Sequence, residues 1–136
     1  GVFVMRDAMT EPARPLLTGI VQVAMSSADP AKLVAWYRDV LGIPVLFEAG
    51  GMTFFQSGAT RLMIGANHNG AVLGGDGIIY FEPADFAAAE TELEARGVQF
   101  FHVADVVQRA PGRELALRAF KDPEGHSLAL LGWRRA

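Results

Sequence analysis

Three polar side chains lie in two strand-like runs, where they are placed to bind or activate a small molecule. The run at 19–25, GIVQVAM, carries Gln22, and the run at 77–82, GIIYFE, carries Tyr80 and Glu82. Alternate residues of a strand share one face, so Tyr80 and Glu82 are expected on the same side. An amide donates and accepts hydrogen bonds, a tyrosine ring stacks, and a carboxylate in an apolar cleft serves as a general base or holds a cation.

Each of these side chains also has a structural interpretation, which the sequence leaves open. The Gln22 amide can be satisfied by neighbouring backbone groups, and Tyr80 can pack in the cleft or at an interface. Glu82 can be a surface charge at a strand end, because Pro83 follows it directly. We therefore keep Gln22, Tyr80 and Glu82 as candidate ligand-binding residues, with Glu82 also a candidate catalytic residue.

The three histidines do not form a recognisable catalytic arrangement. His102 lies in the run FFHVADVV and is the fourth candidate, either for ligand binding and acid–base chemistry or as a structural strand residue. His126, in the turn DPEGH, is expected to hydrogen-bond locally, and His68 lies in an Asn- and Gly-rich connection. No nucleophile–base–acid triad follows from these positions.

Two similar strand–helix segments position the candidates. Asp29 followed by Pro30 predicts a helix start, because Asp caps free N–H groups and Pro suits the first helical turn. Gly42 predicts where that helix stops, and Asp85 and Gly97 bracket a second helix in the same way. The near-equal spacing of these pairs indicates an internal repeat, and repeats this small should pack together to bury their sheets.

The remaining segments complete each repeat as a βαβββ module. Further extended runs lie at 44–48, 52–56, 60–64, 98–107, 114–120 and 126–133. We predict an α+β fold with curved mixed sheets around a cleft and helices outside. Adjacent pairs such as Phe54 and Phe55 must point to opposite sheet faces, so aromatic surface should line that cleft. The predicted parts are an arm at 1–15 and one domain at 16–136, divided into module one (16–65), a linker (66–76) and module two (77–133).

Composition narrows the function classes. The chain has 136 residues, of which 51% are hydrophobic and 20% are charged, which fits one folded domain rather than a disordered chain. A net charge of -3 argues against general nucleic-acid binding. The absence of cysteine excludes disulfides and thiolate metal sites. No stretch is long and apolar enough for a membrane helix, and the N-terminal residues do not read as a signal peptide, so a cytoplasmic location is expected.

Two motifs give a specific resemblance. WYRDVLGI at 36–43 and KDPEGH at 121–126 together resemble the vicinal oxygen chelate superfamily, which includes glyoxalase I, extradiol dioxygenases, and fosfomycin- and bleomycin-resistance proteins. The resemblance covers residues 16–133. It implies paired βαβββ modules around a cleft, commonly in a homodimer. It does not determine the activity, because members of one fold carry out unrelated functions.

The resemblance also implies where metal ligands would stand. In the superfamily's metal enzymes, each module supplies one ligand from its first strand and one from its last strand. The matching positions here are Gln22, Met63, Ile78 and Ala129. Of these, Gln22 alone offers a ligand for a hard divalent cation. A relocated site built from Gln22, Glu82 and His102 is the alternative.

We therefore expect a bleomycin-resistance-like protein without metal or other cofactor, which binds a small organic ligand in an aromatic-lined cleft as a homodimer. The alternative is a glyoxalase- or lyase-type enzyme with relocated metal ligands or metal-free acid–base catalysis by Glu82 or His102. A third interpretation is a dimeric scaffold whose cleft is filled by its own side chains.

Overall fold

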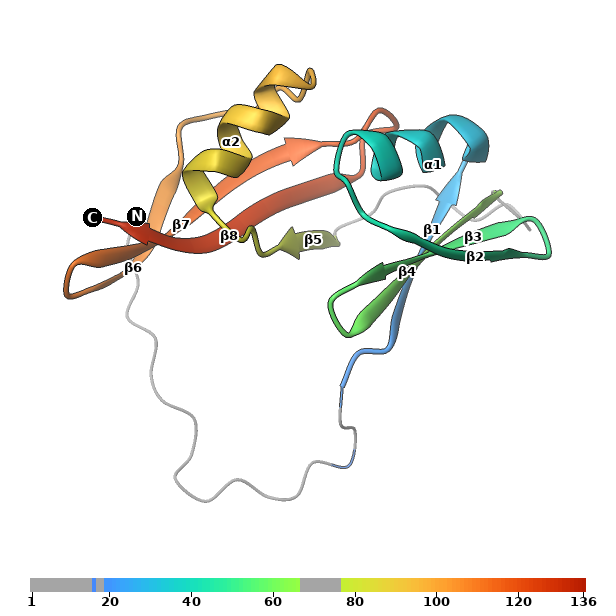
Figure 1. Cartoon of the computed structure of the whole chain (residues 1–136), viewed down its shortest axis with the longest axis horizontal. Coiled ribbons are helices and arrows are strands. Elements are labelled where there is room, and N and C mark those ends of the chain that lie inside the picture. The colour runs from blue at the N-terminus through green and yellow to red at the C-terminus, as the bar shows by residue number, and fades with distance from the viewer. Residues whose placement is uncertain (1–15, 17–18, 67–76) are drawn as a thin grey trace.

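The computed structural model of the chain describes residue 16 and residues 19–66 and 77–136 (Figure 1). The predicted arm at 1–15, most of the predicted linker and His68 lie outside the described residues. The elements follow the order β1 (Gln22–Ser27), α1 (Pro30–Asp39), β2 (Val45–Ala49), β3 (Met52–Ser57), β4 (Thr60–Ala66), β5 (Ile78–Phe81), α2 (Phe86–Ala95), β6 (Asp105–Ala110), β7 (Arg113–Lys121) and β8 (Ser127–Arg135). None of the described helices is long and apolar enough to cross a membrane.

The ten elements form two βαβββ modules, as the internal repeat predicts. One sheet has the strand order β1-β4-β3-β2 and the other has the order β5-β8-β7-β6. In each sheet the first strand pairs in parallel with the last strand of the module, and the other neighbours are antiparallel. Figure 1 shows α1 and α2 on the same side of the two sheets. The predicted α+β fold is confirmed.

The helix boundaries follow the predicted capping residues. The Asp29 side chain accepts a hydrogen bond from the backbone N–H of Lys32, and the Asp85 side chain accepts one from the backbone N–H of Ala88. Gly42 and Gly97 follow the two helices with φ angles of 70° and 95°, a backbone region that favours glycine. The repeated Asp and Gly positions therefore set where both helices begin and end.

Each helix packs on one face of its sheet and leaves the other face open. In β1, Met25 and Ser27 are buried toward the helix, while Gln22 and Ala24 are exposed on the opposite face. The same alternation makes Phe55 a fully buried core residue, although Phe54 beside it is only half-buried. We call the sheet surface that faces away from the helices the open face.

The two resemblance motifs meet where the modules join. Tyr37 Oη, from α1, donates a 2.8 Å hydrogen bond to Oδ2 of the buried Asp122, which precedes β8. His126 Nδ1 donates to the same carboxylate at 2.7 Å, so its ring is held locally as predicted. Glu124 accepts from Ser27 Oγ and, at 2.8 Å, from the backbone N–H of Ala28. These contacts fix module two against the start of the first helix.

The junction also shifts two pKa values. Burial and the neighbouring Asp122 carboxylate raise the pKa of Tyr37 well above its ordinary value, so the phenol stays protonated as a donor. Burial alone would raise the pKa of Glu124, but hydrogen bonds from Ser27 and the following backbone outweigh it and lower that pKa. Glu124 therefore acts at neutral pH as a charged acceptor.

The prediction of an extended run at 98–107 is wrong for residues 98–104, because β6 begins only at Asp105. Val98 is buried and Phe100 turns toward the helix-side core, where its ring lies 5.5 Å from that of Phe120. The chain therefore enters the edge of the second sheet only at Asp105. His102 lies in the bend before β6, and its carbonyl accepts a 2.9 Å hydrogen bond from Arg118 Nε.

Candidate functional site

Strand register brings the four positions implied by the resemblance onto the open face. Gln22 pairs with Arg61 and Ala24 with Met63, which makes Gln22 and Met63 diagonal neighbours across β1 and β4. In module two the corresponding strands place Ile78 and Ala129 in the same diagonal relation. Gln22 Nε2 lies 4.0 Å from Met63 Sδ. Gln22 and Met63 in module one therefore correspond in sheet position to Ile78 and Ala129 in module two.

The side chains at these positions do not fit a divalent metal ion. A hard cation binds oxygen or nitrogen donors at about 2 Å. Ile78 and Ala129 carry no donor atom, and Met63 offers a thioether, a soft ligand. Within residues 19–66 and 77–136, no group of three or more His, Cys, Asp or Glu side chains is placed to hold a metal ion. Gln22 is thus left as one amide ligand without partners.

A cavity of about 340 Å³ lies between module one and β5, and we call it the seam cavity. Module one lines it with Ser57, Thr60 and Arg61, while Ile78 and Tyr80 come from β5. Ile78 and Tyr80 are 48% and 50% exposed, which is high for large apolar side chains on a strand. The seam cavity thus combines an apolar wall from module two with polar groups from module one.

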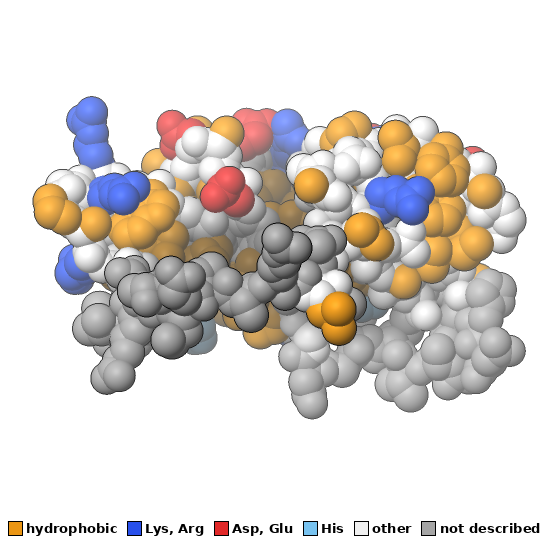
Figure 2. Space-filling view, turned by 90° about the horizontal axis from the view of Figure 1, so that it is seen from below, with side chains coloured by type: hydrophobic (Ala, Val, Ile, Leu, Met, Phe, Trp, Pro, Cys, Tyr) orange, Lys and Arg blue, Asp and Glu red, His pale blue; other side chains and the backbone are white. Residues whose placement is uncertain are grey.

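The open face beside the seam cavity is aromatic and basic. The rings of Phe47 and Phe54 stack with centroids 4.5 Å apart, and the Arg61 guanidinium lies 5.8 Å from the Phe54 ring. Figure 2 looks onto this side of the molecule and shows hydrophobic side chains over both sheets, with Lys and Arg side chains among them. This surface suits a flat or chain-like apolar ligand.

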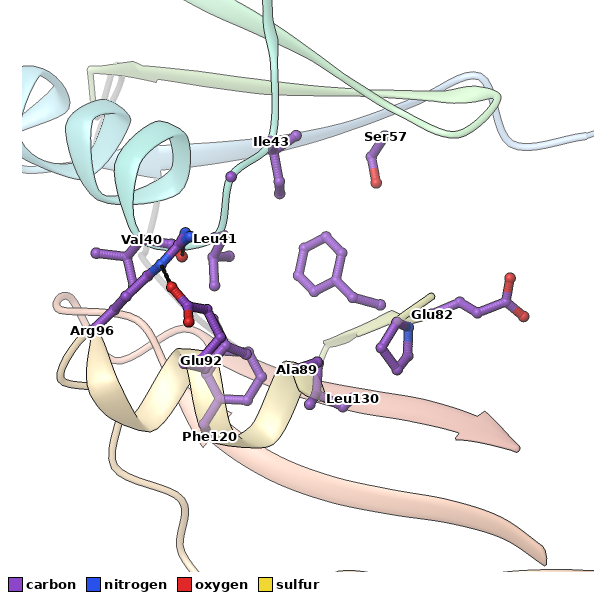
Figure 3. A pocket seen from close by; sticks show the side chains of 14 residues that line it. Val40, Leu41, Ile43, Ser57, Glu82, Ala89, Glu92, Arg96, Phe120 and Leu130 are labelled. Atoms are coloured by element: carbon purple, nitrogen blue, oxygen red, sulfur yellow. Dashed lines mark hydrogen bonds and ion pairs between the residues drawn. The ribbon is translucent and has the colours of Figure 1, made fainter. Parts of the chain in front are cut away.

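A second cavity of about 400 Å³ lies between the modules on the side of the helices, and we call it the helix-side cavity. It shares Ser57 and Phe81 with the seam cavity. Arg96 Nε donates to Glu92 at 2.9 Å, and Arg96 Nη1 donates to the Val40 carbonyl at 2.9 Å (Figure 3). These bonds neutralise the guanidinium and fasten α2 to the end of α1, so Arg96 is a structural residue here.

The structure places the predicted candidates in three separate locations. Tyr80 lines the seam cavity, and Gln22 lies on the open face paired in register with Arg61. Glu82 lies instead at the helix-side cavity, and Figure 3 shows its carboxylate directed away from the other labelled side chains. His102 is exposed before β6, three strands from β5 in the sheet, a separation of roughly 14 Å at the usual strand spacing. Gln22, Glu82 and His102 are therefore not brought together.

Arg61 is the residue of the seam cavity that the candidate set lacks. A signal for it exists in the sequence, because in TRLMI the apolar Leu62 and Ile64 alternate with Arg61 and Met63. The alternation puts Arg61 on the open face, on the same side of β4 as Met63.

Comparisons with known proteins agree with this architecture. A structure of lactoylglutathione lyase from Agrobacterium tumefaciens is similar with a TM-score of 0.66 and 22% identity, covering 87% of this chain and 96% of that chain. A putative glyoxalase family protein from Bacillus anthracis has a TM-score of 0.71 and 17% identity, with coverage of 90% and 100%. An integron cassette protein from the V. cholerae mobile metagenome has a TM-score of 0.73 and 17% identity, with coverage of 88% and 98%.

At these identities the structural likeness shows the fold alone. A comparison with curated protein sequences gave no match. The family model of the Glyoxalase/Bleomycin resistance protein/Dioxygenase superfamily matches residues 19–130, which is most of the chain. The chain therefore belongs to the Glyoxalase/Bleomycin resistance protein/Dioxygenase superfamily.

Proposed function

We propose that this protein binds a small organic ligand without a metal ion, in the seam cavity and on the adjoining open face. One observation carries the proposal. The strand register puts Gln22, Met63, Ile78 and Ala129 at equivalent places in the two modules, and three of these side chains cannot ligate a hard cation. The surface that would hold a metal in a related enzyme is here thioether and alkyl.

The shape and chemistry of the seam cavity support ligand binding. Its volume of about 340 Å³ is within the range of small-molecule sites. The exposed apolar side chains of Ile78 and Tyr80 gain from being covered, at about 25 cal/mol for each Å² removed from water. The hydroxyl group of Tyr80 and the donors of module one supply the few polar groups that orient a ligand.

The proposal includes a homodimer. All five residues of β2 are exposed, and this edge strand carries Val45, Leu46 and Phe47. An exposed apolar edge is prone to pair with another chain, and natural proteins usually cover it. Light scattering coupled to size-exclusion chromatography tests this part, with a mass of twice 14.6 kDa as the expected result.

The enzymatic alternative has less support. The Glu82 carboxylate points away from the cavity that it borders, and His102 lies beyond the opposite edge of the second sheet. General acid–base catalysis requires groups within hydrogen-bond reach of one substrate, about 2.6–3.2 Å from its reacting atoms. These two residues do not share a site.

Binding of a neutral probe tests the proposal. We expect 4-phenylbutan-1-ol to bind saturably by isothermal titration calorimetry, and Tyr80→Ala to weaken it about tenfold, because the substitution removes an aromatic wall. Trp133→Ala is the matched control, since Trp133 is an exposed open-face aromatic that does not line the seam cavity. Absence of saturable binding, or equal losses in both variants, would contradict the proposed site.

A further inference from the structure

The guanidinium of Arg61 has no counter-ion among the described residues. Five other arginines form ion pairs with carboxylates: Arg38, Arg96, Arg109, Arg118 and Arg134. No ion pair and no side-chain hydrogen bond of Arg61 occurs within 19–66 and 77–136, and its guanidinium lies over the face of the Phe54 ring. Arg61 as a whole is half-buried, and no carboxylate within 19–66 and 77–136 neutralises its charge.

Arg118 shows what a structural arginine looks like in the same fold. It also lies over an aromatic ring, 4.4 Å from Phe100, but it points to the helix side. Its Nη1 pairs with Glu90 at 2.6 Å and with Glu94 at 3.3 Å. The charge of Arg118 is therefore satisfied by α2, whereas the charge of Arg61 is left for something outside the described chain.

The surroundings of Arg61 favour an anion with an apolar body. Among the described residues, none of those lining the seam cavity is acidic, and its other polar side chains carry hydroxyl groups. The Thr60 hydroxyl already donates to the Ile20 carbonyl at 3.0 Å, which leaves Ser57 and Tyr80 as further donors. Across from them lies the apolar wall of Ile78. A carboxylate facing Arg61 would place the rest of the ligand against that wall.

We propose that the seam cavity binds a small organic carboxylate, with Arg61 holding the carboxylate and Tyr80 and Ile78 covering the apolar body. This inference rests on the proposed function and specifies its ligand class. A guanidinium binds a carboxylate through two parallel hydrogen bonds, the stronger kind of protein hydrogen bond. The chain has a net charge of -3, so its long-range field would not by itself favour an anion. The preference is local to Arg61.

Three probes of equal length separate the head-group chemistry from the apolar contact. They are 4-phenylbutyrate, 4-phenylbutan-1-ol and 4-phenylbutylamine, titrated into the full chain by calorimetry at fixed ionic strength. We expect the carboxylate to bind about tenfold more tightly than the alcohol, as one charge-assisted interaction provides, and the amine to bind most weakly.

Arg61→Met keeps an unbranched apolar side chain and removes the charge. It should lower carboxylate binding to the level of the alcohol, because the charge-assisted interaction is lost while the apolar wall is intact. Arg61→Lys should restore part of the preference, since lysine keeps the charge without the planar fork. Arg113→Met is the matched control. Arg113 also stacks on an aromatic ring, at 4.2 Å from Trp133, and forms no ion pair within 19–66 and 77–136, but it does not line the seam cavity.

The outcomes distinguish this inference from the proposed function. Equal binding of carboxylate and alcohol, or a preference for the amine, overturns the anion assignment while the small-molecule site stands. Loss of the preference in Arg113→Met as well as in Arg61→Met would show a general charge effect and also overturn it. If none of the three probes binds, the proposed function and the anion assignment both fail.

Discussion

The two modules share one topology but present different chemistry on the open face. At equivalent register positions, module one has Gln22 paired with Arg61, and module two has Ile78 paired with Ser127. Module one thus supplies amide and guanidinium groups, whereas module two supplies an apolar wall. A fold built from two similar halves has in this way produced an asymmetric site, which suits an amphiphilic ligand better than a symmetric metal centre.

On the helix side, each module fills the space between its helix and its sheet with its own side chains. In module one the core is closed by Tyr37 and Phe55, whose rings are 6.2 Å apart. In module two the corresponding region contains Arg118, neutralised by Glu90 and Glu94. Among the described residues, the charge of Arg118 on the helix side is paired with carboxylates, whereas the charge of Arg61 on the open face is not. This difference favours the open face as the side that binds a ligand.

The largest expected effect comes from separating the modules. Asp122→Ala removes the buried acceptor of Tyr37 Oη, His126 Nδ1 and two backbone N–H groups. Leaving several buried donors unpaired should lower the free energy of unfolding by about 3–5 kcal/mol. Chemical denaturation measures the change. Asp39→Ala is the control, because Asp39 forms an exposed ion pair with Arg38 and its loss should leave the free energy of unfolding nearly unchanged. Similar losses in both variants would contradict the assigned role of the junction.

A second change places metal-binding side chains at two of the four positions that the resemblance implies, one in each module. Met63→Glu combined with Ile78→His adds two donors beside Gln22 on the open face. Three protein ligands on the open face should hold Zn²⁺ at least about a hundredfold more tightly than the unaltered chain does. Competition with a chromogenic chelator measures the affinity. Met63→Glu alone should give little gain, and an equal gain from it would mean that Ile78 is not near the other two.

The smallest expected effect is a pH dependence at the junction. The lowered pKa of Glu124 means that its contribution to stability is present above the ordinary pKa of a glutamate and is lost as the pH falls through the folded-state value. Glu124→Gln should therefore be less stable than the parent at neutral pH, and the difference should vanish in acid. Denaturation curves at several pH values test this. A difference that grows on acidification would show that the sign is wrong.

Much of the fold follows from local sequence signals. Asp29 and Asp85 cap helices through their own side chains, and Gly42 and Gly97 end them, so the repeat is visible without any tertiary information. The conformation of residues 98–104, which precede β6, is harder to predict. Whether residues 98–104 pair with β7 depends on Phe100 turning into the core against Phe120. The alternation of apolar and polar residues in the sequence does not reveal such a tertiary contact.

The site follows from the sequence only in part. Alternation along one strand predicts that Tyr80 faces the same side as Ile78, and the structure agrees. Alternation alone does not show where a strand ends. By alternation Glu82 would face the same side as Tyr80, but β5 ends at Phe81 and Glu82 lies at the helix-side cavity. Arg61 becomes informative only when its strand register and its partners are known, because only the fold shows that no carboxylate within 19–66 and 77–136 pairs with it.

The metal content of the native protein is the most direct test of the central claim, which is that the open face keeps the place of the superfamily's metal site without the atoms to fill it. The protein would be purified without chelator and its divalent ions counted by inductively coupled plasma mass spectrometry. We expect far less than one ion per chain, unchanged by Gln22→Ala. One tightly held divalent ion per chain, released by Gln22→Ala, would contradict the account.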